Sequence, residues 1–87
     1  MHEVGSIARI ENALGQASPR EALAALIHAL KSERMSQADM FKLFDSLRAK
    51  YEDPTTEVKY DAITDTMDII SGWCRPELRL FETELRR

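Results

Sequence analysis

Four carboxylates recur at intervals of three or four residues between positions 57 and 68. They are Glu57, Asp61, Asp65 and Asp68. On a helical wheel at about 100° per residue they fall within an arc of about 80° and form one acidic stripe. Such a stripe could attract a basic protein, share a divalent cation between carboxylates one turn apart, or simply face water. A solvated face is the simplest of these interpretations, and docking of a basic protein is the strongest functional one.

Elsewhere the reactive side chains stand alone. Cys74 is the only cysteine, so the chain has no internal disulfide and no thiol pair for zinc or redox exchange. His28 has no second histidine or cysteine near it in sequence, and His2 lies beside the N-terminus. There is no glycine-rich phosphate loop and no nucleophile paired with a base. We therefore predict that the protein is not an enzyme, and we expect no catalytic residue, no metal and no cofactor.

Negative charge is concentrated in the part of the chain that holds the stripe. Residues 52–74 carry six acidic side chains and one basic one, while the whole chain of 87 residues has a net charge of −3. Like charges at i and i+4 destabilise a helix by roughly a few tenths of a kcal/mol per pair, so helix stability alone would not select this stripe. An acidic chain also lacks the attraction to phosphates that drives nucleic-acid binding. We therefore expect a basic protein partner and no nucleic acid.

Composition places the chain among soluble globular proteins. Apolar residues make up 44% and charged residues 31%, which is typical of a sequence that folds. The longest apolar runs are a few residues, far short of the roughly 20 that cross a bilayer. The first residues also lack the apolar core of a signal peptide. We expect a single cytoplasmic domain that is not inserted in a membrane.

Turn and cap residues divide the chain into helices. The stretch SPRE at 18–21 has the form of a capping box with proline at the first helical position, and Ser36 repeats the cap. Asp53-Pro54 ends one helix and begins another, and Gly72 can adopt the left-handed conformation that terminates it. No segment alternates with a period of two over a useful length. The sequence predicts an all-α, single-domain bundle of four to five helices, at residues 6–14, 19–33, 37–52, 54–71 and 76–85.

Apolar positions with helical spacing supply the expected core. In the segments 19–33 and 37–52 they are Leu23, Leu26, Ile27 and Leu30, and Met40, Leu43, Phe44, Leu47 and Tyr51. In the segment 54–71 and just beyond it they fill about 200° of the wheel, which is typical of a helix that touches two or more neighbours, so we expect this helix to be central. They are Val58, Tyr60, Ala62, Ile63, Thr66, Met67, Ile69, Ile70 and Trp73. Lys59 points into this arc, where its stem can lie on neighbours while the ammonium reaches water. Phe41 is offset from the apolar stripe of its own helix and is a candidate for contact with a partner.

Two further interpretations stay open. The wide apolar arc around Ile63, Ile70 and Trp73 could also build a homodimer, which would make the protein structural or self-assembling. The segments 19–33 and 37–52, with a short turn between them, have the outline of a helix-turn-helix, which would make the protein a DNA-binding regulator. The second of these segments mixes acidic with basic side chains on its exposed face, so the DNA-binding role is the less favoured one.

Two stretches, SQADMFKLFDSLRAKY and DAITDTMDIISGWCRPELRLF, resemble small uncharacterised bacterial all-helical proteins that combine an Asp-x-Met-Asp segment with Gly-Trp-Cys-x-Pro. The resemblance covers residues 19–81 and implies no catalytic activity and no ligand. In size, acidity and helical pattern the chain is also similar to immunity proteins, which neutralise bacterial toxins by covering a basic nucleic-acid site with an acidic face. This second similarity is an analogy without a shared motif, and it implies a toxin-neutralising role.

We therefore predict a non-enzymatic protein-binding module that covers a basic surface of its partner. The residues predicted to contact the partner are Glu52, Asp53, Glu57, Asp61, Asp65, Asp68 and Phe41. Carboxylates aligned in this way would speed association and select the partner by charge. In the alternative interpretation of a solvated face, the basic C-terminal segment, for example Arg75 or Arg79, neutralises part of the stripe.

Overall fold

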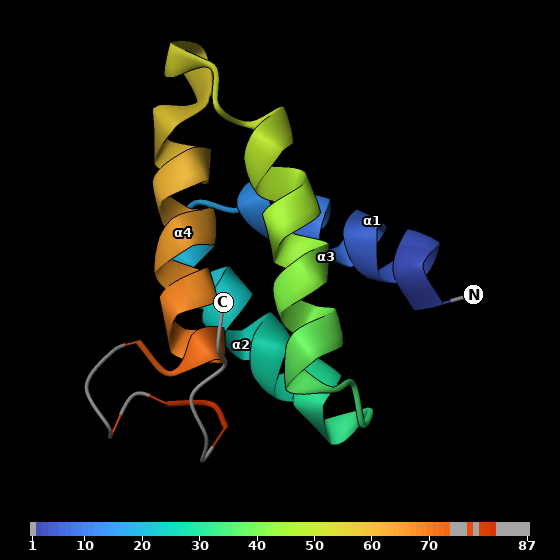
Figure 1. Cartoon of the computed structure of the whole chain (residues 1–87). Helices are drawn as coiled ribbons and strands as arrows, with labels where there is room; N and C mark the ends of the chain where they lie inside the picture. Colours follow the sequence, from blue (N-terminus) through green and yellow to red (C-terminus); the bar gives the residue numbers. More distant parts are fainter. Residues whose placement is uncertain (1, 74–76, 78, 82–87) are drawn as a thin grey trace.

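The computed structural model describes residues 2–73, 77 and 79–81, with side chains described from residue 5 onward. Its helical elements are α1 (His2–Leu14), α2 (Pro19–Ser32), α3 (Gln37–Lys50), the short 3-10 helix η1 (Pro54–Thr56) and α4 (Glu57–Ser71), as drawn in Figure 1. No strand occurs among the described residues, and none of their helices has the length and apolar character needed to cross a bilayer. The predicted all-α fold is confirmed, with four α-helices in this part of the chain.

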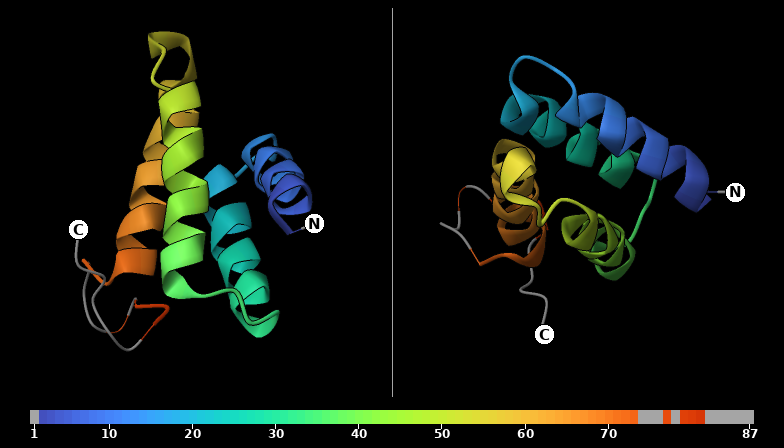
Figure 2. Two further views of the ribbon diagram at one scale, coloured as in Figure 1. Left: turned by 45° about the vertical axis from the view of Figure 1, so that its right-hand side comes forward. Right: turned by 90° about the horizontal axis from the view of Figure 1, so that it is seen from above.

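The four α-helices form two layers. α3 and α4 run antiparallel and lie side by side, while α1 packs against α2 (Figure 1). Seen from above, α1 and α2 form one layer and α3 with α4 the other (Figure 2). α2 lies against α4 and α1 touches α3, so each layer covers the apolar side of the other. The prediction that the helix ending at Ser71 contacts two neighbours is confirmed.

Apolar side chains from all four helices meet between these layers. Phe44 of α3 and Ile63 and Ile70 of α4 are 0% exposed. Other side chains with less than 3% of their surface exposed are Ile10, Leu14, Leu23, Ile27, Leu30, Met40 and Ala62. The predicted apolar faces of α2 and α3 therefore form the core, although Leu26 and Tyr51 are only half-buried.

The helix ends follow the predicted signals at Ser36 and Gly72, but not in the cap at Ser18. The Ser36 hydroxyl accepts a hydrogen bond from the Asp39 N–H at 3.1 Å and caps α3. Gly72 has φ 87° and ends α4, because a residue with no Cβ adopts this left-handed conformation without strain. The capping box predicted at Ser18 is wrong, since its side chain makes no cap hydrogen bond. α2 still begins at Pro19, whose ring fixes a helical φ and whose missing N–H needs no partner there.

The predicted helix at 54–71 is divided. Its first three residues form η1, and α4 begins at Glu57. The Asp53 carboxylate accepts hydrogen bonds from both the N–H and the hydroxyl of Thr55 at 2.8 Å. The Thr56 hydroxyl in turn donates to the Tyr51 carbonyl at 2.9 Å. These local bonds compete with the α-helical pattern and hold the chain in a tighter turn.

Other boundaries also move. α1 begins four residues before the predicted start at 6, and α3 ends at Lys50, two residues before the predicted end. Of the fifth helix predicted at 76–85, most residues lie outside the described part, and residues 79–81 are not helical. Here Leu80 is buried, and its carbonyl accepts a hydrogen bond from Lys31 Nζ at 2.6 Å. The chain at Leu80 is therefore held by α2.

Candidate functional site

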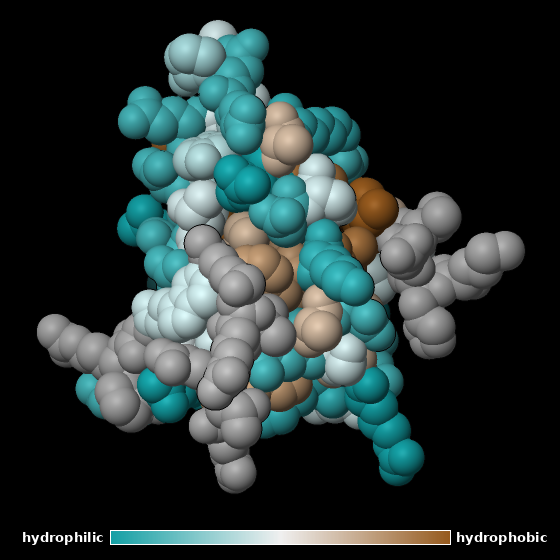
Figure 3. All heavy atoms as spheres, viewed as in Figure 1, coloured by the Kyte–Doolittle hydropathy of each residue, from teal (hydrophilic) through white to brown (hydrophobic). Residues whose placement is uncertain are grey.

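The four carboxylates of the predicted stripe all lie on α4, and we call them the α4 stripe. Glu57, Asp61 and Asp65 are exposed, while Asp68 is half-buried. In Figure 3, which has the view of Figure 1, hydrophilic residues cover much of the left-hand edge beside α4. Apolar residues are visible between α4 and α3. The stripe follows from the helical period, because residues three and four apart share a helix face.

One member of the α4 stripe is paired inside the molecule. Arg20, in the first turn of α2, places its guanidinium 2.9 Å from the Asp65 carboxylate. The carboxylates of Glu57 and Asp61 form no ion pair with any described residue. The prediction that Arg75 or Arg79 neutralises the stripe is not met among the described residues, because Arg79 Nε donates to the Gly72 carbonyl at 3.1 Å and Arg75 lies outside them.

The predicted contacts Glu52 and Asp53 lie in the connection between α3 and η1. Glu52 lies 3.6 Å from Arg48, and Asp53 is bound to Thr55 as described above. The Thr55 N–H, followed by its hydroxyl, lowers the pKa of Asp53 below its ordinary value. Both carboxylates therefore have local roles at a helix junction, and neither lies on α4 with the four carboxylates of the stripe.

Phe41, the predicted apolar contact, lies on α3 and is half-buried. Its ring meets that of Trp73 edge to face, with 6.2 Å between the ring centres. Trp73 is itself half-buried, so it neither fills the core completely nor projects freely as an anchor. The structure brings Phe41 together with Asp68 of the α4 stripe, because both line one hollow between α3 and α4.

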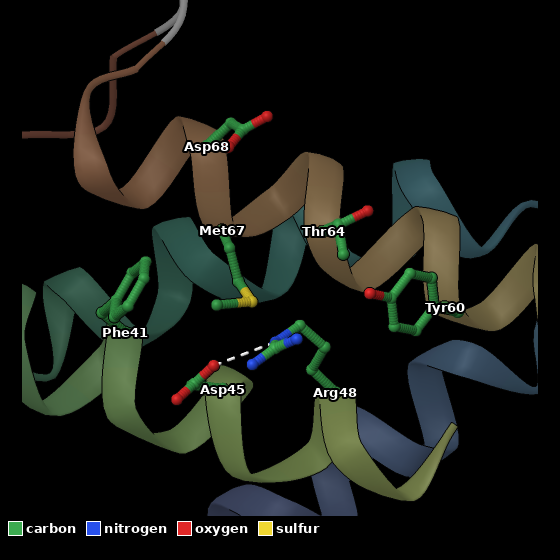
Figure 4. A pocket seen from close by; sticks show the side chains of 7 residues that line it. All are labelled: Phe41, Asp45, Arg48, Tyr60, Thr64, Met67 and Asp68. Carbon is green, nitrogen blue, oxygen red and sulfur yellow. Dashed lines mark hydrogen bonds and ion pairs between the residues drawn. The ribbon is translucent and has the colours of Figure 1, made fainter. Parts of the chain in front are cut away.

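We call this depression of about 610 Å³ the α3–α4 hollow. Its lining consists of Phe41, Asp45, Arg48, Tyr60, Thr64, Met67 and Asp68 (Figure 4). Arg48 Nε lies 3.0 Å from the Asp45 carboxylate. The pKa of the Arg48 guanidinium is raised, mainly by the Tyr60 hydroxyl and next by the Asp45 carboxylate. The hollow was not predicted from the sequence, because it joins side chains from two helices. The i, i+3 spacing of Asp45 and Arg48 is the one local signal, and it indicates only their pairing.

A smaller depression flanks the other side of the α4 stripe. It has a volume of about 270 Å³ and lies between α4 and the connection from α1 to α2. We call it the Val58 hollow, and its lining consists of Ala17, Ser18, Pro19, Arg20, Val58, Asp61 and Ala62. Val58 is 70% exposed, and among the described residues it is the large hydrophobic side chain that faces solvent.

The placement of Val58 in the core was a wrong prediction. Val58 lies in the first turn of α4, beside the connection from α1 to α2 and the first turn of α2, and these leave its side chain largely exposed. Lys59, predicted to lay its stem on neighbours, is half-buried with Nζ 5.7 Å from the centre of the Tyr51 ring. The ammonium therefore has an aromatic face beside it.

The remaining candidates for chemistry are dispersed. His28 is exposed on α2, and Cys74 lies outside the described residues. Within the described part of the chain, no group of three or more His, Cys, Asp or Glu side chains is placed to hold a metal ion.

No model of a known protein family matches the chain, and neither a curated protein nor a solved structure is significantly similar to it. The geometry of α4 and of the hollows on its two flanks is therefore what bears on function.

Proposed function

We propose that the protein is a non-enzymatic binding module that covers a basic surface of another protein with the α4 stripe. One observation carries the proposal: Glu57 and Asp61 are exposed and have no ion pair among the described residues, and Val58, 70% exposed, lies between them in sequence. Unpaired carboxylates attract and orient a cationic surface, and an adjacent apolar side chain adds contact area once water is expelled.

The two hollows give the partner places to insert side chains. They lie on either side of the stripe, since Asp61 lines the Val58 hollow and Asp68 lines the α3–α4 hollow. A carboxylate ridge between two depressions supports docking by shape as well as by charge. The charge of the stripe would act mainly on the association rate and on the choice of partner. Added salt would weaken this attraction, because the screening length is about 8 Å at physiological ionic strength.

A partner with a strongly basic surface is the class that fits. A toxin that acts on nucleic acid is one such protein, because its own substrate is a chain of phosphates. Binding of that site by the α4 stripe would make this chain an immunity-type protein of the bacterial cytoplasm. This assignment of the partner class rests on analogy with the charge and size of such proteins.

The other two interpretations find less support. Ile63 and Ile70, the proposed centre of a homodimer, are 0% exposed inside the chain's own core. For DNA binding, Lys50 on α3 is bound to the Glu11 carboxylate at 2.6 Å, and Asp39 is exposed on the same helix. These observations favour the binding module over the two alternatives.

Site-specific photo-crosslinking tests the proposal. A photoreactive amino acid at Val58 should capture a basic protein from extracts of the native host at low salt, whereas one at His28, which is exposed on α2, should not. Charge reversal by Asp61→Lys should reduce capture at least about tenfold, since it replaces attraction with repulsion. The matched control is Asp39→Lys, which makes the same charge change at an exposed acid of α3. Equal capture by the Asp61→Lys variant and the unaltered protein would refute the role of the stripe.

A further inference from the structure

The α3–α4 hollow has two chemically different ends. Figure 4 shows Phe41 and Asp45 of α3 and Met67 of α4 towards one end, Asp68 at the rim of the same end with its carboxylate directed away from α3, and Arg48, Thr64 and Tyr60 towards the other end. The first end combines two carboxylates with apolar surface, and the second combines a guanidinium with two hydroxyls. A single ligand would meet different chemistry at each.

The charges at the two ends are not equally satisfied. Arg48 contacts two carboxylates, at 3.0 Å from Asp45 and 3.6 Å from Glu52, so its charge is compensated inside the molecule. The Asp68 carboxylate is half-buried and forms no ion pair with a described residue. A partly buried carboxylate without a counter-charge loses hydration and gains no partner, which favours a cation at this end of the hollow.

Apolar surface accompanies this carboxylate. Met67 is only 4% exposed, and its thioether lies in the middle of the hollow (Figure 4). Phe41 adds a ring that is held edge to face against Trp73. A thioether and an aromatic ring suit a flexible methylene stem, and a ring attracts a cation that lies against it.

We infer that the α3–α4 hollow is a subsite for one arginine side chain of the partner. This inference rests on the proposed function and specifies the partner's chemistry. The methylene stem lies on Met67 and Phe41, and the guanidinium pairs with Asp68, which belongs to both the α4 stripe and the hollow. Arginine fits better than lysine because its planar guanidinium is weakly hydrated and stacks on aromatic rings.

The experiment uses n-butylguanidinium as a probe for the arginine side chain, with n-butylurea as its neutral counterpart. The chain contains four methionines, so a spectrum of ¹³C-methyl methionine is simple to follow. We expect n-butylguanidinium to shift the Met67 methyl signal saturably, with a Kd of about 10 mM for so small a ligand. The signal of Met40, which is 0% exposed, should stay in place. n-Butylurea should shift the Met67 signal far less, because it lacks the charge.

Variants separate this subsite from the stripe as a whole. Asp68→Asn should weaken the probe about fivefold, as expected for loss of an ion pair near the surface, while Asp39→Asn should leave its Kd unchanged. No saturable shift, equal shifts with n-butylurea, or an unchanged Kd in Asp68→Asn would each overturn the inference. If these failures occur while Asp61→Lys still abolishes crosslinking, the arginine subsite is wrong and the proposed function stands. If the probe binds as expected while Asp61→Lys leaves crosslinking unchanged, the hollow recognises guanidinium and the proposed function is the one that fails.

Discussion

Arg20 and Asp65 form an ion pair of 2.9 Å that joins the first turn of α2 to the middle of α4. The two side chains remain 65% and 52% exposed, so the pair contributes little to stability, about 0.2–1 kcal/mol. Its larger effect is on the surface charge, because it compensates one of the four carboxylates of the α4 stripe. The stripe therefore presents its uncompensated charge at Glu57 and Asp61 on one side and at Asp68 on the other.

Removal of Arg20 should strengthen partner binding. Arg20→Gln leaves Asp65 uncompensated and adds negative charge to the stripe, so capture by the crosslinker at position 58 should increase, while the free energy of unfolding changes by less than about 1 kcal/mol. The matched control is Arg9→Gln, which removes the same charge from the exposed Arg9–Glu33 pair of 2.8 Å. Equal increases in both variants would mean that net charge, and not the local stripe, governs capture.

Two serines that precede helices should respond differently to substitution. Ser36→Ala removes the oxygen that accepts the Asp39 N–H, which should cost about 1 kcal/mol and lower Tm by roughly 5 °C. Ser18→Ala removes a hydroxyl that makes no cap hydrogen bond, so Tm should fall by less than about 2 °C. Thermal unfolding followed by circular dichroism measures both. The reverse order of effects would be inconsistent with the described caps.

The all-helical class and several helix ends could be predicted because their signals are local. Pro19, Ser36 and Gly72 act on the backbone of their own residue or of the next few, whatever surrounds them. The apolar period likewise identified the buried faces of α2 and α3. The cap residues mark where a helix begins or ends, and the apolar period marks which of its sides is buried. Neither identifies the segment that packs against that side.

The parts of the site that could not be predicted depend on contacts between distant segments. Arg20 meets Asp65 only because α2 packs against α4, and the α3–α4 hollow is formed by side chains of two helices that are separate in the sequence. Val58 has the helical phase of a core residue, but at the first turn of α4 it faces the connection between α1 and α2. Periodicity gives the direction in which a residue points from the helix axis. It carries no information about which segment, if any, packs against that turn of the helix.

The pKa of Asp53 should depend on Thr55. A carboxylate whose pKa is lowered in the folded state contributes stability above its unfolded pKa, about 4, and this stability is lost as the pH falls through the lower folded value. Thr55→Ala removes the hydroxyl donor and keeps the backbone N–H, which is the larger cause. The pKa should therefore rise only part of the way to its ordinary value.

Carboxyl ¹³C NMR titration between about pH 2 and pH 6 follows this change directly. Thr64→Ala is a suitable control, because the Thr64 hydroxyl donates to the Asp61 carbonyl and not to a carboxylate. A pKa of Asp53 that does not move in Thr55→Ala would show that the hydroxyl has no part in lowering it.

Ile63 and Val58 provide the sharpest comparison within α4, because both were expected in the core. Ile63 is 0% exposed and Val58 is 70% exposed. Ile63→Ala leaves a cavity among side chains of both layers and should cost about 2–5 kcal/mol, whereas Val58→Ala should change the free energy of unfolding by less than about 0.5 kcal/mol. Urea unfolding measures the change in the free energy of unfolding for each variant.

Sedimentation of the same two variants distinguishes a core residue from an interface residue. If Ile63 belongs to the core of one chain, Ile63→Ala lowers the urea midpoint without changing the sedimenting mass in the absence of urea. A homodimer built on Ile63 would instead dissociate into smaller folded particles, and the midpoint would depend on protein concentration. That second result would place the apolar side of α4 between two chains, and the acidic side would then no longer be the free surface from which a partner is recognised.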